Sequence, residues 1–180
     1  MSRFGPVMQV AFVTRDIGGL MHFYAREMGV GPWFYTERSP MESVRYRGQP
    51  VSVHLSVGVA FAGDTQIELL QQRDDGPSVY LDWMKRPFER QLQHHVAMWP
   101  VDFAAKLDLA LASGYEVVQD GGTARGRFAF LLHPQNPDYM LEFTEATPGR
   151  TAYRAAAARA ARDWDGRDPV RSFDSLAVAT

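Results

Sequence analysis

Hydrophobic and polar positions alternate along this chain in an order that occurs twice. In the first half the strand-like run VMQVAFV leads to Asp16, and apolar positions then recur at helical spacing as far as Gly29. In the second half HHVAMWPV leads to Asp102, and the amphipathic run FAAKLDLALAS ends at Gly114. An Asp before a helix accepts hydrogen bonds from free backbone N–H groups, and a glycine ends the helix. The pattern therefore predicts two units, each a strand followed by a helix.

Each predicted helix is followed by several strand-like runs. The first set is VSVHLSVGVAF and TQIELLQQ, which residues 62–64 separate as a hairpin turn. The second set is EVVQ, GRFAFLLH and DYMLEFTE, with turns expected at residues 120–122 and near Pro134. Residues 33–50 are expected to form a loop between the first helix and these strands. Each half is thus predicted to contain one strand, one helix and then more strands.

The repeat predicts an α+β protein built from two tandem modules. We assign residues 7–72 to the first module, 73–93 to a linker with a short helix, 94–146 to the second module and 147–180 to a C-terminal helix and tail. Residues 151–164 are rich in Ala and Arg, which favour a helix. The arginines from Arg154 to Arg162 either attract an anionic substrate or form a solvent-facing surface, and the second interpretation is favoured. The last residues show no periodicity and are expected to be extended.

The two opening strands carry candidate metal ligands at matching positions. Gln9 begins QVAFVTRD and His95 begins HVAMWPVD, and each is followed by an Asp seven positions later. Side chains alternate between the two faces of a strand, so Trp99 is expected to share the face of His95 while His94 points away. We therefore expect Gln9 and His95 to face one cavity.

A glutamate lies in the last strand of each half, Glu68 in TQIELL and Glu142 in YMLEFTE. A carboxylate or amide in an apolar strand is costly to bury without a partner. A single divalent cation would give a partner to four such groups, those of Gln9, Glu68, His95 and Glu142. Zn, Co, Ni, Mn and Fe all accept nitrogen and oxygen ligands of this kind. The alternative is that each residue is partly exposed and hydrogen-bonded locally, which explains one polar residue better than four at related positions.

Three further residues are candidate substrate contacts. His54 and Ser56 share one face of a predicted strand, and this face is expected to line the cavity between Gln9 and Glu68. Trp99 is expected to contact the substrate from the opening strand of the second half.

Composition narrows the possible function classes. The 180 residues contain no cysteine, which excludes disulfides, thiolate metal sites and a cysteine nucleophile. The formal net charge of −2 comes from mixed charges without a basic block, so nucleic acid is not an expected partner. No apolar run reaches the roughly 18 residues of a membrane span, and the N-terminus lacks the apolar region of a signal peptide. We expect a cytoplasmic protein without a membrane partner.

These motifs resemble the vicinal oxygen chelate superfamily, which includes glyoxalase I, methylmalonyl-CoA epimerase, extradiol dioxygenase and the fosfomycin or bleomycin resistance proteins. The resemblance covers residues 7 to 146 and rests on QVAFVTRD, GVGPW, TQIELLQ, LQHHVAMW and MLEFTE. It is strongest with the epimerase-like and glyoxalase-like branches. It implies a glyoxalase-like fold, in which paired βαβββ modules close a curved sheet around a metal. The family's ligand positions fall on Gln9, Glu68, His95 and Glu142.

The resemblance also implies a mechanism, in which the metal acts as a Lewis acid and Glu68 or Glu142 removes a proton next to a carbonyl. The leading hypothesis is a metal-dependent isomerase, epimerase or lyase, similar to methylmalonyl-CoA epimerase, that acts on a small molecule with a carbonyl or carboxylate. Gln9 argues against extradiol dioxygenases, which need two histidines and one carboxylate. Two alternatives stay open: a glyoxalase I-like lactoylglutathione lyase, whose ligand set is similar, and a non-catalytic small-molecule-binding protein of the resistance type. Superfamily members often pair, so a homodimer is compatible with the resemblance.

Overall fold

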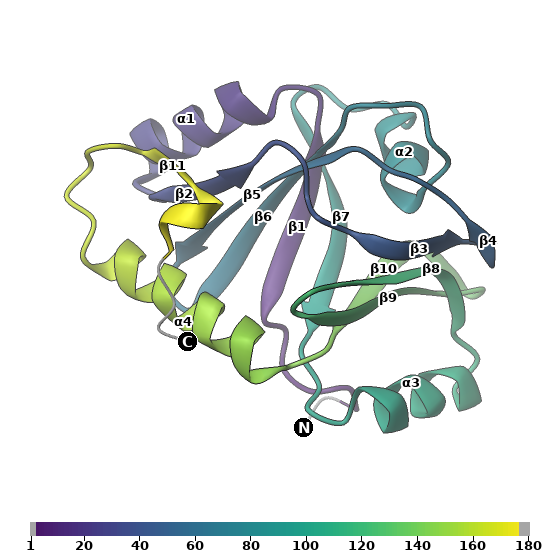
Figure 1. Ribbon diagram of the computed structural model, residues 1–180. Coiled ribbons are helices and arrows are strands. Elements are labelled where there is room, and N and C mark those ends of the chain that lie inside the picture. The colour runs from purple at the N-terminus through teal and green to yellow at the C-terminus, as the bar shows by residue number, and fades with distance from the viewer. Residues whose placement is uncertain (1–2, 177–180) are drawn as a thin grey trace.

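The computed structural model describes residues 3–176, and their strands form one curved, open sheet (Figure 1). Two antiparallel strands lie at its centre, β1 (Gln9–Thr14) and β7 (Gln91–Met98). Next to them lie β6 (Thr65–Gln72), parallel to β1, and β10 (Asn136–Thr144), parallel to β7. The strand pair β1–β6 of the first half therefore corresponds to the pair β7–β10 of the second half, as the repeat in the sequence predicts.

The outer strands extend this arrangement in both directions. Beyond β6 lie β5 (Leu55–Ala62), β2 (Trp33–Thr36) and β11 (Val170–Ser172); beyond β10 lie β9 (Gly126–His133), β8 (Glu116–Thr123), β3 (Glu42–Tyr46) and β4 (Gln49–Pro50). The predicted α+β class and glyoxalase-like curved sheet are confirmed. The short helix α2 (Val79–Met84) lies between the halves, and β7 begins three residues before the expected boundary at residue 94.

The helices α1 (Ile17–Met28) and α3 (Phe103–Ala112) begin at the two predicted caps. The Asp16 carboxylate accepts a hydrogen bond from the Gly19 N–H at 2.9 Å, and the Asp102 carboxylate accepts one from Ala105 N–H at 3.0 Å. Gly29 ends α1 with a φ of 64°, in the left-handed region that glycine favours. The aspartates that close the two repeated sequences therefore have the same structural role.

Loss of either cap is expected to weaken the fold modestly. Asp16→Ala and Asp102→Ala should each lower the free energy of unfolding by about 1 kcal/mol, because each removes the acceptor of one helical N–H group. Asp108→Ala is the matched control, since Asp108 is exposed in the middle of α3 and caps nothing. Urea unfolding of the three variants measures the difference. Equal values for all three would contradict the capping role.

The region 33–50 is not a loop, which corrects the prediction from sequence. It contains β2, β3 and β4, and β3 crosses to the second half of the sheet, where Arg45 pairs with Asp120 of β8. Only Val44 of β3 is buried, because β3 lies near the sheet edge. A strand so exposed has no alternation of apolar and polar residues, so its sequence gives no strand signal.

The predicted turn at residues 120–122 is also wrong, because these residues continue β8. Gly121 pairs with Phe128, and a Cβ atom on Gly121 would lie 2.8 Å from the Phe128 ring and 3.2 Å from the Val44 Cα. The glycine is therefore needed for the close approach of β3 and β9 rather than for a turn. The actual turn is at residues 124–125, which places Arg125 at the tip of the β8–β9 hairpin.

The C-terminal extension lies over the sheet. Helix α4 (Pro148–Arg162) runs across the ends of β6 and β1 in Figure 1, and β11 pairs in parallel with β2. A short 3₁₀ turn, Phe173–Ser175, follows β11, and the Phe173 ring stacks on Tyr153 of α4 at 5.1 Å. The extended conformation predicted for the tail is confirmed at β11; residues 177–180 lie outside the described part of the chain.

The two faces of the sheet have different coverings. Along β1, Val10 and Phe12 pack towards α3 and α1, whereas Ala11 and Val13 face the opposite, concave side. This concave side is covered only in part, by α2, α4 and the C-terminal turn. No helix within residues 3–176 is long and apolar enough to cross a membrane. Polar side chains that share the face of Ala11 therefore lie in a partly open cavity.

Candidate metal centre

Three side chains from neighbouring strands converge on the concave face. Glu68 on β6, His95 on β7 and Glu142 on β10 each offer a ligand atom, and these atoms all lie within 4.8 Å of one another. The His95 Nε2 atom is 2.9 Å from Glu142 Oε2 and 3.6 Å from Glu68 Oε2. The structure thus brings together three of the four residues that the repeat predicts as ligands.

Gln9, the fourth predicted ligand, lies beside these three. It is buried, pairs with Gln66 and Ala97 in the sheet, and lines the same cavity as Glu68 and Glu142. Its position on β1, between β6 and β7, follows directly from the strand order. An amide oxygen here can add a neutral ligand to two carboxylates and an imidazole.

The two carboxylates differ in their acidity. Burial, helped by the charge of Glu142, raises the pKa of Glu68 to about 7, although His95 and a hydrogen bond from Gln9 act in the opposite direction. Burial also raises the pKa of Glu142, but the charge of a protonated His95, whose Nε2 lies 2.9 Å from Glu142 Oε2, outweighs it and lowers this pKa overall. Glu142 is therefore the more firmly ionised of the two.

The donor geometry fits a bound cation. The His95 Nε2 atom is buried and has no hydrogen-bond partner within residues 3–176, although two carboxylate oxygens lie within 3.6 Å of it. A nitrogen that approaches two carboxylates without forming a hydrogen bond to either is well placed to share a metal ion with them. One imidazole nitrogen with carboxylate and amide oxygens suits Zn, Co, Ni, Mn or Fe. The residues therefore fit the divalent metal that the resemblance implies.

His94 does not point away from His95, which corrects the prediction from strand alternation. On β1, Ala11 pairs with His95 but Phe12 pairs with Gln93, so His94 is an extra residue in a β-bulge. The bulge places both imidazole rings on one side of the sheet, with their Nδ1 atoms 2.8 Å apart. Strict alternation of side chains along a strand cannot predict such a one-residue bulge.

The position of the protons on these two rings follows from their partners. The His94 Nε2 atom is 3.3 Å from the Val79 carbonyl oxygen, which can only accept, so Nε2 carries the proton. Burial lowers the pKa of His94 well below its usual value, so the ring is neutral and its Nδ1 accepts. The His95 Nδ1 must then donate to it. In the neutral form of His95 the lone pair is therefore on Nε2, the atom that faces Glu68 and Glu142.

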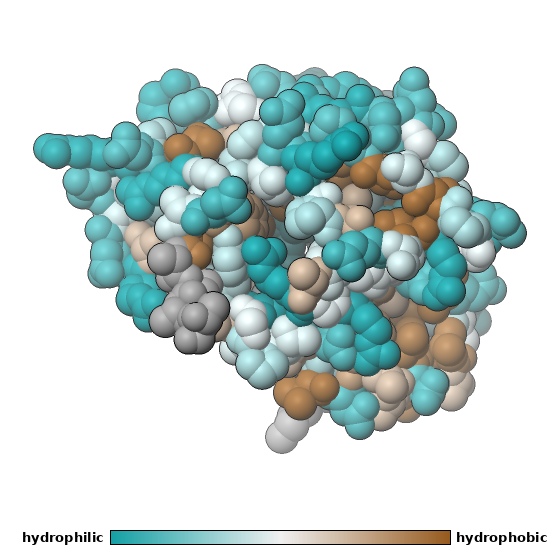
Figure 2. Space-filling model, in the orientation of Figure 1, coloured by the Kyte–Doolittle hydropathy of each residue, from teal (hydrophilic) through white to brown (hydrophobic). Residues whose placement is uncertain are grey.

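The cavity at these residues has two lobes, and the molecular surface is hollowed near the middle of this face (Figure 2). The first lobe, of about 210 Å³ and here called the apolar lobe, has a small majority of apolar lining residues, which include Met41, Leu55, Val57, Leu70, Tyr80, Phe128 and Phe130. Thr36, Ser39 and Asp174 are polar residues of the same wall. The second lobe, of about 160 Å³, lies beneath α4 and is lined by Gln9, Trp99, Thr144, Arg150, Tyr153 and Arg154 among others. Glu68, Glu142, Arg125 and Phe173 line both lobes. The candidate ligands thus lie at the junction.

The predicted substrate contacts have different outcomes. Trp99 lines the second lobe, on the same side of the sheet as His95. Ser56 does not line either lobe: it is fully buried, and its hydroxyl donates to the Glu37 carbonyl and accepts from Arg73. His54 lies just before β5 and also lines neither lobe. His54 and Ser56 lie outside both lobes because Leu55 and Val57, at the alternate positions, face the cavity.

Two arginines and a phenylalanine of the cavity wall were missed, namely Arg125, Arg150 and Phe173. Arg154 also lines the second lobe, although a solvent-facing position was the favoured interpretation for it. Arg150, Arg154 and the buried Ala157 are spaced by four and three residues, so they share one helix face. That spacing in the sequence indicates that the two arginines lie on the buried side of the helix. Arg125 in a turn and Phe173 in the tail have no such signal, and they reach the cavity only through tertiary structure.

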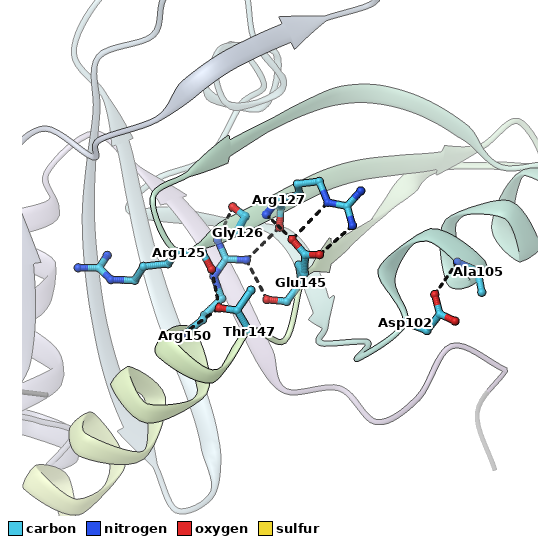
Figure 3. A network of polar contacts seen from close by, with 8 residues as sticks. All are labelled: Asp102, Ala105, Arg125, Gly126, Arg127, Glu145, Thr147 and Arg150. Carbon is cyan, nitrogen blue, oxygen red and sulfur yellow. Dashed lines mark hydrogen bonds and ion pairs between the residues drawn. The ribbon is translucent and has the colours of Figure 1, made fainter. Parts of the chain in front are cut away.

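Arg150 fastens the start of α4 to the β8–β9 turn (Figure 3). Its guanidinium donates to the carbonyl oxygens of Arg127 at 2.9 Å, Gly126 at 3.1 Å and Glu145 at 3.2 Å. The side chain of Arg127 forms an ion pair with the Glu145 carboxylate at 2.7 Å. Figure 3 shows Arg125 pointing away from this network. The guanidinium of Arg125 is therefore not used in the anchor.

Comparisons with known proteins are consistent with the fold. The model of the Glyoxalase/Bleomycin resistance protein/Dioxygenase superfamily matches residues 8–130. A hypothetical protein from Bacillus halodurans superposes with a TM-score of 0.56 at 18% identity, covering 79% of this chain and 94% of its own. Methylmalonyl-CoA epimerase from Mycobacterium tuberculosis gives 0.55 at 17% identity, with 81% and 91% covered.

The Streptomyces coelicolor methylmalonyl-CoA epimerase, solved in complex with 2-nitronate-propionyl-CoA, superposes with a TM-score of 0.54 at 18% identity, with 80% of this chain and 99% of the epimerase covered. Identities this low establish a shared fold and not a shared substrate. No curated protein matches the sequence.

Proposed function

Because the chain belongs to the glyoxalase/bleomycin resistance protein/dioxygenase superfamily, we propose that it is a metal-dependent isomerase, epimerase or lyase that transfers a proton at a carbon next to a carbonyl. The observation that carries the proposal is the convergence of Glu68 and Glu142 on the His95 Nε2 atom within an open cavity. The epimerases among the structural neighbours favour the epimerase-like form of this chemistry.

The metal would be held by His95 Nε2, the carboxylates of Glu68 and Glu142, and the amide oxygen of Gln9. When bound, a divalent metal polarises a carbonyl and stabilises the negative charge that develops as the neighbouring carbon loses a proton. The His94 ring keeps the His95 lone pair directed to this point, since its Nδ1 accepts the other ring proton.

One carboxylate must accept the substrate proton. Glu68 lies 3.6 Å from His95 Nε2, whereas Glu142 lies at 2.9 Å. Glu68 is thus the less closely held of the two, and 16% of its side chain is exposed to the cavity. We assign the role of base to Glu68 and the role of permanent ligand to Glu142. The reverse assignment would require the more firmly ionised group to leave its partner.

The apolar lobe supports this chemistry by limiting water. Leucine, valine and phenylalanine side chains form its walls, and Tyr80 is fully buried beside them. Electrostatic interactions become stronger where water is excluded, so charge that develops near Glu68 and Glu142 is more sensitive to their positions. The lobe would hold the uncharged part of a substrate next to the reacting carbon.

Metal analysis and proton exchange test the proposal together. Protein purified without chelator should contain about one divalent ion per chain. With 2-substituted acyl thioesters in deuterated water, the metal-loaded protein should catalyse deuterium incorporation at the α-carbon, which NMR detects. A protein that binds no divalent ion and exchanges no α-proton in this set would refute the proposal.

Metal binding is expected to weaken below neutral pH. Because the pKa of Glu68 is about 7 in the metal-free protein, a proton competes with the metal for this carboxylate at lower pH. This group alone should lower the apparent affinity by up to about tenfold for each pH unit below 7. Titration calorimetry with zinc over a pH series measures the slope. Glu68→Gln removes the titrating group, so its slope should be smaller.

The raised pKa of Glu68 has the opposite effect on the metal-free fold. Below the ordinary carboxyl pKa of 4.5, Glu68 is protonated in both folded and unfolded chains, and its contribution to stability is fully present. That contribution is lost as the pH rises through about 7, because the folded site then holds an unfavourable buried charge. Metal stabilises the protein most where this loss is complete, above pH 7.

Gln9 favours one second candidate, a glyoxalase I-like lyase, because the set of Gln, Glu, His and Glu resembles that of glyoxalase I. This candidate predicts turnover of the hemithioacetal formed from methylglyoxal and a thiol. Lack of turnover by the metal-loaded protein would exclude it. A protein that binds small molecules without metal and without turnover would instead belong with the resistance-type members.

A further inference from the structure

The lobe beneath α4 contains three guanidinium groups without a counter-charge of their own. Within residues 3–176, Arg125, Arg150 and Arg154 form no ion pair within 4.0 Å. Arg150 donates to neutral carbonyl oxygens, and Arg154 donates to those of Asp64 at 2.7 Å and Met8 at 3.5 Å. Glutamates of the candidate metal centre are the acidic groups that line this lobe.

Several donors in this lobe are unused. The Arg154 Nε–H and the Trp99 Nε1–H are buried and have no acceptor in the described part of the chain. The Arg154 guanidinium lies 5.9 Å from the Trp99 ring centre, so the two residues are neighbours. The Arg125 guanidinium makes no side-chain hydrogen bond among the described residues and lies over the Tyr153 ring at 4.2 Å. Buried donors without acceptors are unfavourable, and a bound acceptor would relieve them.

A divalent metal makes the charge imbalance larger. Two positive charges at the candidate centre would neutralise the carboxylates of Glu68 and Glu142. The three arginines would then be uncompensated in a half-enclosed space. Guanidinium groups match the paired oxygens of carboxylate and phosphate, and an indole N–H can donate to the same oxygens. The lobe is therefore complementary to an anionic group.

We propose that this lobe binds an anionic group, carboxylate or phosphate, carried by the substrate of the proposed enzyme, whose carbonyl lies at the metal centre. The inference rests on the proposed function. Arg125 makes the principal contact, Trp99 and Arg154 supply further donors, and Arg150 positions the helix that forms the roof. An uncharged group of the same substrate occupies the apolar lobe. Arg150 and Arg154 lie on α4, outside the matched family region of residues 8–130, so the C-terminal extension supplies part of this subsite, and Arg125 and Trp99 supply the rest from within that region.

The size of the lobe limits the anion to a short group. About 160 Å³ is less than a typical small-molecule pocket of roughly 300 Å³ or more, so it holds the acidic end of a molecule rather than a whole nucleotide. The substrate is thus an amphipathic acid, with the reacting carbon between an apolar group and an anionic group.

Anion titration tests the inference. Phosphate and malonate are titrated separately into zinc-loaded protein, and binding is measured by calorimetry. Arg125→Gln should weaken binding of the preferred anion by about tenfold or more, since a charge-assisted hydrogen bond is lost. Trp99→Phe removes only the indole donor and should give a smaller loss. Arg159→Gln, a matched loss of charge on the exposed face of α4, should change the affinity less than twofold.

Phosphate and malonate show which class of anion the protein prefers, and the variants show whether that anion binds in the second lobe. Preference for malonate assigns a carboxylate, and preference for phosphate assigns a phosphate; either supports the subsite if Arg125→Gln weakens it. The inference is overturned if neither anion binds, or if both bind wild type and Arg125→Gln equally, as direct binding to zinc would produce. Metal titration of the same samples separates the causes. Bound zinc without anion binding refutes only the subsite, whereas failure to bind zinc or any of the other candidate divalent ions refutes the proposed function.

Discussion

Glu142→Gln is expected to lower the affinity for a divalent metal by about a hundredfold or more. The substitution keeps the shape of the side chain but removes the anionic oxygen that lies 2.9 Å from His95 Nε2. Replacement of a group that only supports a metal ligand typically costs about 10–100-fold in affinity, so loss of a ligand itself belongs at or above the upper end. Competition with a chromogenic chelator measures the affinity, and α-proton exchange should fall with it.

The control for this prediction is Glu116→Gln. Glu116 is exposed on β8 and lines neither lobe, so the same chemical change there should leave metal affinity unaltered. Circular dichroism of the metal-free variants shows whether the fold is retained. An unchanged affinity in a folded Glu142→Gln protein would remove Glu142 from the ligand set and, with it, the assignment of Glu68 as the base.

His94→Phe is expected to reduce metal affinity by about 10–100-fold, the usual range for a partner of a metal-bound histidine. The phenyl ring preserves the packing against Tyr80, Trp83 and Phe130, whose ring centres lie within 5.7 Å. It cannot accept the Nδ1 proton of His95. The His95 ring is then free to move its proton to Nε2, the atom that must stay unprotonated to bind metal.

Nitrogen NMR of the imidazole rings tests this role directly. In the metal-free wild type, His95 should carry its proton on Nδ1, and in His94→Phe this preference should be lost. His94→Asn restores an acceptor and should recover part of the affinity. His133→Phe alters a histidine on the other side of the fold and serves as the control. A His95 tautomer that is the same in wild type and His94→Phe would contradict the positioning role.

The parts of the fold that could be predicted are those encoded locally. Asp16 and Asp102 are followed by helices because a carboxylate one position before a helix satisfies its first N–H groups, whatever the rest of the chain does. The repeat of these caps, with Glu68 and Glu142 each in a later strand, predicted two tandem modules, and the resemblance to the vicinal oxygen chelate superfamily added the curved sheet. The central strands could also be predicted, because their buried faces require apolar residues that recur along the sequence.

The parts that could not be predicted depend on pairing between distant strands. The bulge at His94 arises from the register of β7 against β1, and the sequence of β7 has no mark of it. In the same way, β3 is a strand because β8 offers it an edge, and Gly121 allows the approach. Turn chemistry suggested the wrong role for that glycine because close packing and a turn both require a missing Cβ.

The candidate site divides along the same line. Glu68, His95 and Glu142 lie together as the repeat predicts, and their role as ligands remains a prediction. His54 and Ser56 were misplaced because the strand β5 starts at Leu55 and presents its alternate residues to the cavity. The arginines of the second lobe could not be predicted, because their positions depend on the path of α4 over the sheet, and composition does not determine that path.

The C-terminal extension joins the two halves of the protein mechanically. Its first turn is fastened by Arg150 to the hairpin of the second half, and its last strand, β11, is paired with β2 of the first half. Between these two fixed points the chain spans the mouth of the cavity. Separation of the halves would break hydrogen bonds at one end or the other. The extension therefore acts as a brace that resists separation of the two halves, and residues of α4 line the second lobe.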